Sequence, residues 1–286
     1  MKKIYIPLVC LLISGIGFSQ PLKTGTGSSG KIKLANGQKI TVESSVDIQA
    51  SLTMGMELTS NSSSINALEV KNSTAKDITI SNTLTKMKVN MNMMGQPNNY
   101  DSEHKEGNNE EMAKIFDERL NKPVDVVVDN TTGLSVTETK KEKKADADAA
   151  NPADDLMKMF SDNSDNGIVA GAFEIIPVGK SAGDSWSDTA LAKDMKMIRT
   201  YTLKSITGNE ALIQVDVVSN AVNKLDFQEM EFEVKTETKT KGEILADTIT
   251  SLVKKRTTTS DISGTIQMMG QDMPISAKTT STNIYK

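Results

Sequence analysis

Methionine is the residue type whose number and spacing could carry chemistry in this chain. The sequence has 16 methionines, more than its six Phe, four Tyr and one Trp together. Four pairs have Met-X-Met spacing, at Met54/Met56, Met91/Met93, Met157/Met159 and Met195/Met197. In a strand this spacing places both thioethers on one face, where they can fill an irregular core, line an adaptable apolar cavity or ligate Cu(I). All three interpretations stay open. The candidate cavity-lining residues are Met54, Met56, Met87, Met91 and Met197.

Histidine and cysteine occur only once each. His104 is the single histidine and lies in the polar run from Asp101 to Glu111, so we interpret it as an exposed loop residue rather than a general base. One histidine and one cysteine, Cys10, leave no His- or Cys-based metal cluster. We therefore predict a protein that is not an enzyme, with no catalytic residue, no metal ligand and no cofactor.

Three short motifs imitate ligand-binding loops. Residues 25–30 (GTGSSG) match the dinucleotide fingerprint in letters, but the fingerprint needs a strand before it and a helix after it. Residues 179–181 (GKS) resemble the end of a phosphate loop without its upstream glycine. Residues 162–167 (DNSDNG) resemble a calcium loop, but the twelfth position is Phe173, and Glu174 comes one place late. We interpret all three as turns or solvated loops.

Period-two alternation dominates the rest of the chain and predicts strands. From Ile40 to Leu58 every even position except Ser44 is apolar, which predicts strand with one buried face. This run is too long for one straight strand, so it must bend, curl with a sheet or break into two collinear strands. Asn36-Gly37 predicts a hairpin that joins it to a short strand at 31–35. Further strands are predicted at 195–206, 210–219, 225–240, 252–268 and 275–285.

Two phase slips interrupt the alternation. Apolar residues change from even to odd positions near Thr85 and Lys86, and from odd to even positions between Phe227 and Met230. One extra residue in a strand is the smallest change that keeps the apolar side facing inward. We therefore predict a β-bulge at each slip.

Two segments have helical signals. Asn109 caps the run 110–122, which Pro123 ends, and Asn151 caps the run 152–162. Both are predicted to be short helices that cover the sheet. The charged run 140–150 has no apolar periodicity and reads as a poorly ordered connection.

The first residues have the plan of a secretory signal peptide. Lys2 and Lys3 precede an apolar run to Phe18 and then the small or polar Ser19 and Gln20. The run is shorter than a transmembrane helix, and no later run is long enough to be one. Cys10 lies inside the apolar run, which disfavours lipidation. We expect an exported protein, periplasmic or secreted, without a transmembrane segment.

Charge disfavours a nucleic-acid partner. The chain has 33 Lys and Arg against 37 Asp and Glu, a net charge of −4, and only three of its basic residues are Arg. The predicted domains are a signal peptide at 1–20, a flexible Gly/Ser/Thr tether at 21–30 and a β-rich domain at 31–286. That domain is one unit or two similar lobes, 31–139 and 168–286, joined by the charged linker and short helix at 140–167.

Two similar turns support the two-lobe alternative. Residues 129–134 (DNTTGL) and 247–252 (DTITSL) each lie between predicted strands. A second match, Met93–Gln96 with Met268–Gln271, precedes the first turn but follows the second, so the order of motifs conflicts. A tandem duplication therefore stays a hypothesis.

The same turns carry a family resemblance. The pattern comprises Gly37-Gln38, Tyr100–Ser102, Asp129–Leu134, Val178-Gly179 and Gly183–Trp186. It resembles an uncharacterised family of exported Gram-negative envelope proteins, a domain of unknown function, over most of residues 31–286. The resemblance implies no activity. Its long strands with helices on one side are similar in outline to half-barrel carriers of lipid or lipoprotein.

The sequence thus predicts a mainly β (α+β) fold, with long curved antiparallel strands in one or two half-barrel lobes and two short covering helices. We expect non-catalytic binding of an apolar or lipid-like ligand in a concave, Met-rich sheet face. The alternatives are a scaffolding or surface-interaction protein with a filled core and, less favoured, Cu(I) binding through the Met-X-Met pairs. Protein partners are not predicted.

Overall fold

A single antiparallel sheet organises the chain. The computed structural model describes residues 30–51, 57–93, 95–136, 167–192, 194–227, 230–268 and 271–286. Their strands are β1 (Lys39–Ser51), β2 (Glu57–Ser73), β3 (Asp77–Met93), β4 (Gln96–Asp101), β5 (Pro123–Asp129), β6 (Ser185–Ala192), β7 (Met195–Thr207), β8 (Glu210–Phe227), β9 (Met230–Asp247), β10 (Val253–Met268) and β11 (Gln271–Tyr285). The sheet order is β4-β3-β2-β1-β11-β10-β9-β8-β7-β6, and β5 pairs with the first half of β3.

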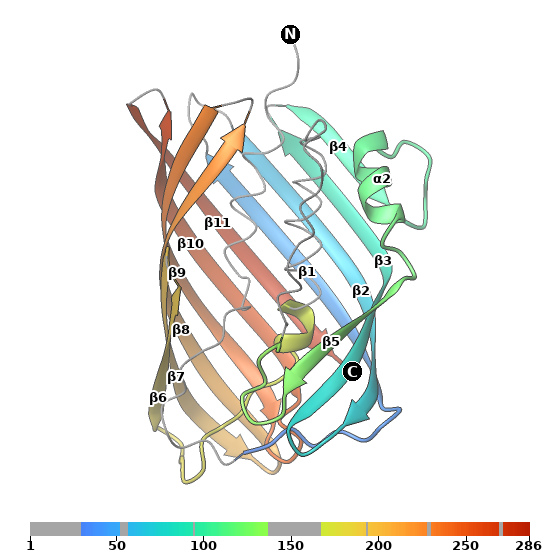
Figure 1. The fold of residues 1–286 in the computed structure, drawn as a ribbon, viewed down its shortest axis with the longest axis vertical. Helices are drawn as coiled ribbons and strands as arrows, with labels where there is room; N and C mark the ends of the chain where they lie inside the picture. The colour runs from blue at the N-terminus through green and yellow to red at the C-terminus, as the bar shows by residue number, and fades with distance from the viewer. Residues whose placement is uncertain are drawn as a thin grey trace.

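The sheet curves into an open half-barrel, which confirms the predicted fold class (Figure 1). Its two edges are β6 on one side and β4 with β5 on the other. Strands β1 to β5 and β6 to β11 adjoin along the β1–β11 pair. We call the end of the sheet with the turns 129–134 and 247–252 the base, and the end where β1 meets β2 and β10 meets β11 the rim.

Alternation fixes which side of each strand faces inward. In β1, Ile40, Val42, Ile48 and Ala50 are buried, whereas the odd-numbered side chains between them are exposed or half-exposed. The same alternation holds along β7 and along β11. Because side chains of a strand alternate between faces, the buried set defines one concave face and the exposed set one convex face.

The bulge predicted near Thr85 is confirmed. Ile65 pairs with Lys86 but its neighbour Asn66 pairs with Leu84, so Thr85 has no partner in the ladder. Its side chain instead donates a hydrogen bond to the Ile65 carbonyl at 2.9 Å. The extra residue returns the apolar side of β3 to the concave face on both sides of the slip.

Two other strand predictions are wrong because a hairpin replaces a continuous strand. The run from Ile40 to Leu58 is two antiparallel strands, with Ser51 facing Glu57. The predicted bulge between Phe227 and Met230 is a reversal of the chain, in which these two residues face each other across β8 and β9. In a hairpin the facing residues share a side of the sheet, so the turn itself sets the phase of the alternation.

Glycines allow the close approach of strands that curvature requires. A Cβ on Gly264 of β10 would lie 2.1 Å from the Lys235 carbonyl oxygen of β9. A Cβ on Gly242 of β9 would lie 2.4 Å from the Thr257 carbonyl oxygen of β10. Glycine in a strand commonly marks such a tight bend. At these two positions of the β9–β10 pair the neighbouring backbone is too close for any side chain, so only glycine fits.

Two chain segments close the base. Residues 31–35 are extended but not part of the sheet, contrary to prediction, because their amides bond to turns: Ile32 N–H donates to the Asn130 carbonyl and Lys33 N–H to the Thr250 carbonyl. Residues 167–177 form the second closure, beginning with a short helix at 167–170. The Tyr285 hydroxyl donates to the Ile168 carbonyl at 3.2 Å, and burial raises the pKa of Tyr285 to about 12.

The predicted helix after Asn109 is present and shorter than expected. Helix α2 spans Glu110–Asp117, with the Asn109 side chain accepting from the Glu111 and Met112 amides. It ends before Pro123 because Asn121 adopts a positive φ of 59° and its amide donates to the Leu84 carbonyl of β3. The predicted helix at 152–162 lies outside the described residues, as do the signal peptide and most of the tether and linker.

The two similar turns have the same geometry. The carboxylate of Asp129 accepts from the amides of Thr131 and Thr132, and that of Asp247 accepts from the amides of Ile249 and Thr250. Each turn also contains a positive-φ residue, Gly133 at 70° and Ser251 at 62°. Burial disfavours the ionised form of both aspartates and so raises their pKa. The hydrogen bonds from the turn together have the larger effect and hold the pKa of each carboxyl below its usual value.

This pairing of carboxylates with turn amides predicts a pH-dependent stability. A lowered folded pKa contributes stability above the unfolded value of about 3.9, and that contribution is lost as pH falls through the folded pKa. The double variant Asp129→Asn with Asp247→Asn is expected to be about 2 kcal/mol less stable than wild type at pH 7. Urea unfolding between pH 7 and pH 2 should show the difference in unfolding free energy between wild type and the double variant shrinking as the pH falls. A difference that stays constant over that range would contradict the conclusion that the two ionised carboxylates stabilise their turns.

Candidate functional site: the concave face

The concave face has three zones between base and rim. The base zone is a large apolar core that includes Ile40, Val42, Ile78, Leu203, Ile213 and Ile244. Next comes a zone that we call the hydroxyl band. Its members are Ser44, Ser60, Ser62, Ser64, Ser219, Thr236, Thr238, Thr240, Thr258, Ser260, Thr279 and Ser281. Nearer the rim is a second apolar zone, the rim belt, made of Ile48, Ala50, Leu58, Val234, Ile262, Ile266, Ile275 and Ala277.

Strand register aligns part of the hydroxyl band across the centre of the sheet, with Ile48 of the rim belt between Ser60 and Thr279. One row of facing residues runs from β3 to β6 across the sheet: Met91, Ser60, Ile48, Thr279, Ser260, Thr240, Val217, Arg199 and Asp188. Side chains that face each other on one side of a sheet lie close enough to interact. In this row the hydroxyls of Ser260 and Thr240 are 2.7 Å apart and hydrogen-bonded.

Two hydroxyls of the band are buried without a hydrogen-bond partner. Thr279 is 4 % exposed and its Oγ1 has no partner, and Ser44 Oγ is likewise unpartnered. Both lie on strands at the centre of the sheet, β11 and β1. An unpaired buried hydroxyl costs about 1–3 kcal/mol, so each one calls for an explanation.

Three of the predicted lining methionines are described, and all three lie on the concave face. Met87 and Met91 of β3 are half-buried and face Ser64 and Ser60, so they border the hydroxyl band. Met197 of β7 is buried in the base core, and six strands lie between β7 and β3 in the sheet order. Met54 and Met56 lie outside the described residues. The structure thus brings Met87 and Met91 together and places Met197 on the opposite flank.

Helix α2 packs on the concave face of β3 beside these methionines. Ile115 and Phe116 of the helix contact Val89 and Tyr100 in a small buried cluster, with Met87 and Met91 packed against it. The rings of Tyr100 and Phe116 are 5.0 Å apart, and the Tyr100 hydroxyl donates to Asp117 at 2.7 Å. Burial and this carboxylate raise the pKa of Tyr100. The helix is therefore anchored rather than resting loosely on the sheet.

Two ion pairs lie on the concave face, one that involves Arg256 of β10 and one at the flank formed by β6 and β7. Arg256 Nη2 is 3.1 Å from Glu174 Oε2, and Arg199 Nε donates to Asp188 Oδ1 at 2.7 Å. Glu174, Arg256 and Arg199 are each less than a tenth exposed. Burial raises the pKa of the Glu174 carboxyl, although both arginines oppose the shift. Positive and negative charges balance within this group.

Aromatic stacking closes the β6 edge of the same flank. Trp186 of β6 faces Tyr201 of β7, with ring centroids 5.4 Å apart and ring planes 10° from parallel. Burial raises the pKa of the Tyr201 hydroxyl. Tyr201 belongs to the base core and Trp186 packs against it, so the pair anchors the edge strand β6 to the core.

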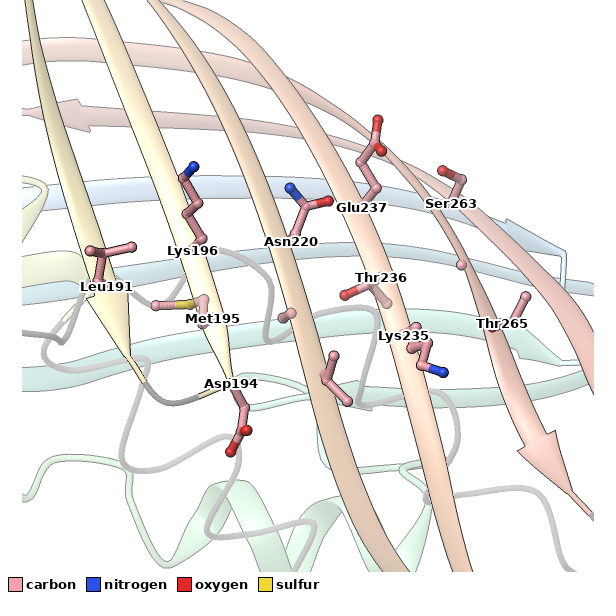
Figure 2. A pocket seen from close by; sticks show the side chains of 13 residues that line it. Leu191, Asp194, Met195, Lys196, Asn220, Lys235, Thr236, Glu237, Ser263 and Thr265 are labelled. Atoms are coloured by element: carbon pink, nitrogen blue, oxygen red, sulfur yellow. The ribbon is translucent and has the colours of Figure 1, made fainter.

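An open pocket of about 810 Å³ lies elsewhere, on the convex face near the rim. Figure 2 shows its lining side chains spread over β6 to β10, with Lys196, Asn220 and Glu237 in one row and Asp194 and Lys235 nearer the rim. The register places these charged and amide side chains on the opposite side of the sheet from the hydroxyl band, although Thr236 of the band also lines the pocket. Its lining carries both signs of charge and includes Met195, but none of the five methionines that the sequence predicted to line a cavity contributes to it.

His104 and the described parts of the motifs that resemble ligand-binding loops have the loop and turn structures predicted from the sequence. The side chain of His104 is 83 % exposed in a loop, with Nδ1 at 3.4 Å from Asp101 Oδ2. Residues 178–180 form a turn in which Gly179 has a φ of +83°. Glu174 pairs with Arg256 and so does not complete a calcium loop, whose residues 162–166 lie outside the described part of the chain.

The described residues contain neither a cluster of metal-ligating side chains nor a membrane-spanning helix. No group of three or more His, Cys, Asp or Glu side chains there could hold a metal ion. In the same ranges, no helix has the length and apolar character needed to cross a membrane.

The hydroxyl band is the feature that sequence reasoning missed. Its signal is present in the alternate positions of several strands: in β11, Ile275 and Ala277 precede Thr279 and Ser281 with the same parity. In β2, Leu58 is followed by serines at 60, 62 and 64. Reading alternation only for apolar residues discards this pattern, because hydroxyl side chains are assigned to the solvent face by default.

The fold and its zoned concave face define an open half-barrel protein. The chain belongs to a family of unknown function, DUF6263, whose model matches residues 75–253. No curated protein sequence matches it. Among solved structures it is similar to lipovitellin, in a structure described as showing lipid–protein interactions, with a TM-score of 0.51 and 10 % identity. That match covers 89 % of this chain and 25 % of the lipovitellin chain, so this chain spans a quarter of its length.

Two other matches have TM-scores that are too low to support an inference. An outer membrane channel from Pseudomonas putida F1 has a TM-score of 0.26 and 8 % identity, with 92 % of this chain and 100 % of that chain covered. The β domain of the Bordetella autotransporter BrkA has a TM-score of 0.28 and 5 % identity, with 86 % and 98 % covered. At 10 % identity, the likeness to lipovitellin shows the fold alone.

Proposed function

We propose that this protein is an exported, non-catalytic carrier that binds an apolar or lipid-like ligand against the concave face of its sheet. The observation that carries the proposal is the rim belt, a second apolar zone on the concave face that is not part of the base core. A fold needs only one core, so a separate apolar zone on the inner side of a curved sheet is typical of a binding surface.

Three further observations support it. Met87 and Met91 border the same face, and thioether side chains adapt to ligands of irregular shape. The fold is similar to that of lipovitellin, with a TM-score of 0.51, and the lipovitellin structure is described in terms of lipid–protein interactions. The first twenty residues have the composition of a secretory signal peptide, which would place the carrier in the periplasm or outside the cell.

A scaffolding protein with a filled interior is the second candidate. The specific observation in its favour is burial: every member of the rim belt is less than a tenth exposed. A belt covered by the protein's own chain needs no ligand. Such a protein would act through its outer surface, where the convex pocket lies.

Native mass spectrometry of protein purified from the cells that produce it, followed by solvent extraction, separates the two candidates. For a carrier, we expect a species heavier than the polypeptide by the mass of an extractable lipid. The same spectra should show a polypeptide that begins near Ser19 or Gln20 and bears no acyl chain. A single ligand-free species would refute the carrier, and diacylglycerol on Cys10 would refute the proposed processing.

A further inference from the structure

The hydroxyl band divides the concave face in a way that a purely apolar ligand does not require. Apolar zones lie on both sides of it, the base core below and the rim belt above. A hydrocarbon held between them would offer no hydrogen bond to the hydroxyls of the band that lack a protein partner. Covering an unpaired hydroxyl in this way costs free energy, so hydrocarbon alone is a poor match for this surface.

The band already contains groups that lack a partner. Thr279 Oγ1 and Ser44 Oγ are buried and unpaired, whereas Ser260 and Thr240 satisfy each other at 2.7 Å. The register directs Thr279 to the concave side, between Ile48 and Ser260. A ligand oxygen within reach of Thr279 would accept the hydrogen bond that the protein does not supply.

Charge limits the chemistry of that ligand group. The hydroxyl band contains no ionisable side chain, and the nearest described ionic groups pair with each other, Arg199 with Asp188 and Arg256 with Glu174. Arg256 keeps one unpaired Nε donor, but the charges of Arg199 and Arg256 are already balanced by Asp188 and Glu174. A charged headgroup buried here would lack a counter-charge and would be strongly disfavoured.

We propose that the ligand is an uncharged ester lipid, of the acylglycerol class, whose ester and hydroxyl oxygens lie on the hydroxyl band with Thr279 while its acyl chain lies along the rim belt. This inference rests on the proposed carrier function and names the ligand class for the same face. Thr279 is a specificity-determining residue in this proposal, because it selects a polar but uncharged group.

The test compares three probes of equal chain length on the purified protein: 1-monooleoylglycerol, 1-octadecene and 1-oleoyl-lysophosphatidate. Binding is measured by native mass spectrometry and by displacement of a polarity-sensitive dye. We expect wild type to bind the acylglycerol about ten-fold more tightly than either of the other probes. Thr279→Val should reduce that preference about five-fold and leave octadecene binding unchanged.

Thr280→Val is the matched control, because Thr280 is the next residue of β11 and faces Asp47 and Thr259 on the convex side. It should leave all three affinities unchanged. Thermal unfolding of the ligand-free variants gives a second readout: Thr279→Val removes an unpaired hydroxyl and should not lower the midpoint.

The outcomes separate this inference from the carrier function. Equal or tighter binding of octadecene or of the lysophosphatidate would overturn the acylglycerol proposal and leave a carrier of another ligand class. Unchanged selectivity in Thr279→Val would overturn the assigned role of the hydroxyl. Failure of all three probes to bind would overturn both the carrier function and the ligand class that depends on it.

Discussion

Replacing Glu174 with alanine is expected to lower the free energy of unfolding by about 3–5 kcal/mol, because it leaves Arg256 buried without its counter-charge. Arg256 is 9 % exposed, and its Nε already has no hydrogen-bond partner. Glu174 also belongs to the segment that closes the base, where its amide donates to the Ser251 carbonyl. Since whole domains are stable by only about 5–15 kcal/mol, urea unfolding should detect a loss of this size easily.

The exposed ion pair between Glu210 and Lys254 provides the matched control. Its atoms are 2.6 Å apart, closer than Glu174 and Arg256, but both side chains are more than two-fifths exposed. Glu210→Ala should therefore cost less than about 1 kcal/mol. The double variant Glu174→Ala with Arg256→Met should regain most of the stability, since it removes both buried charges. If Glu174→Ala is no more damaging than Glu210→Ala, the buried pair does not stabilise the base.

The sequence predicted a strand well where the alternation of apolar residues belongs to that strand alone. The prediction failed where one alternation runs through a hairpin and so covers two strands. Ser51 faces Glu57, so the hairpin joins odd positions to odd positions and the alternation continues unbroken through the turn. Phe227 faces Met230, so that hairpin joins odd to even and imitates the phase slip of a bulge. Alternation reports only which face a residue occupies and is blind to a reversal of chain direction. At Thr85 the same signal was read correctly, because there the strand does continue.

The candidate site was predicted in part for a related reason. Met87 and Met91 were expected on the concave face, and the register places them there, because a spacing of four in a strand keeps a face. Their neighbours across the sheet are Ser64 and Ser60, and these cross-strand partners depend on a pairing that no single strand encodes. The contact between Glu174 and Arg256 joins residues far apart in the chain, so neither could be recognised as half of an ion pair beforehand.

Placing a negative charge on the concave face should strongly weaken ligand binding in a carrier. Ser62 belongs to the hydroxyl band and faces Val46 on one side and Val89 on the other. In Ser62→Glu, a bound lipid would bury a carboxylate among apolar groups, which costs several kcal/mol. We therefore expect about 100-fold weaker binding of 1-monooleoylglycerol, and protein purified without co-extracted lipid.

The adjacent residue gives an unusually close control for this variant. Ser63 is the next residue of β2, is exposed, and faces Ser45 and Lys88 on the convex side. Ser63→Glu adds the same charge at the same level of the same strand, so it should leave binding unchanged. Ser62→Gln adds the size of glutamate without its charge, and should bind more tightly than Ser62→Glu. Because the three variants differ only in face or charge, equal binding by Ser62→Glu and Ser63→Glu would mean that the ligand does not occupy the concave face.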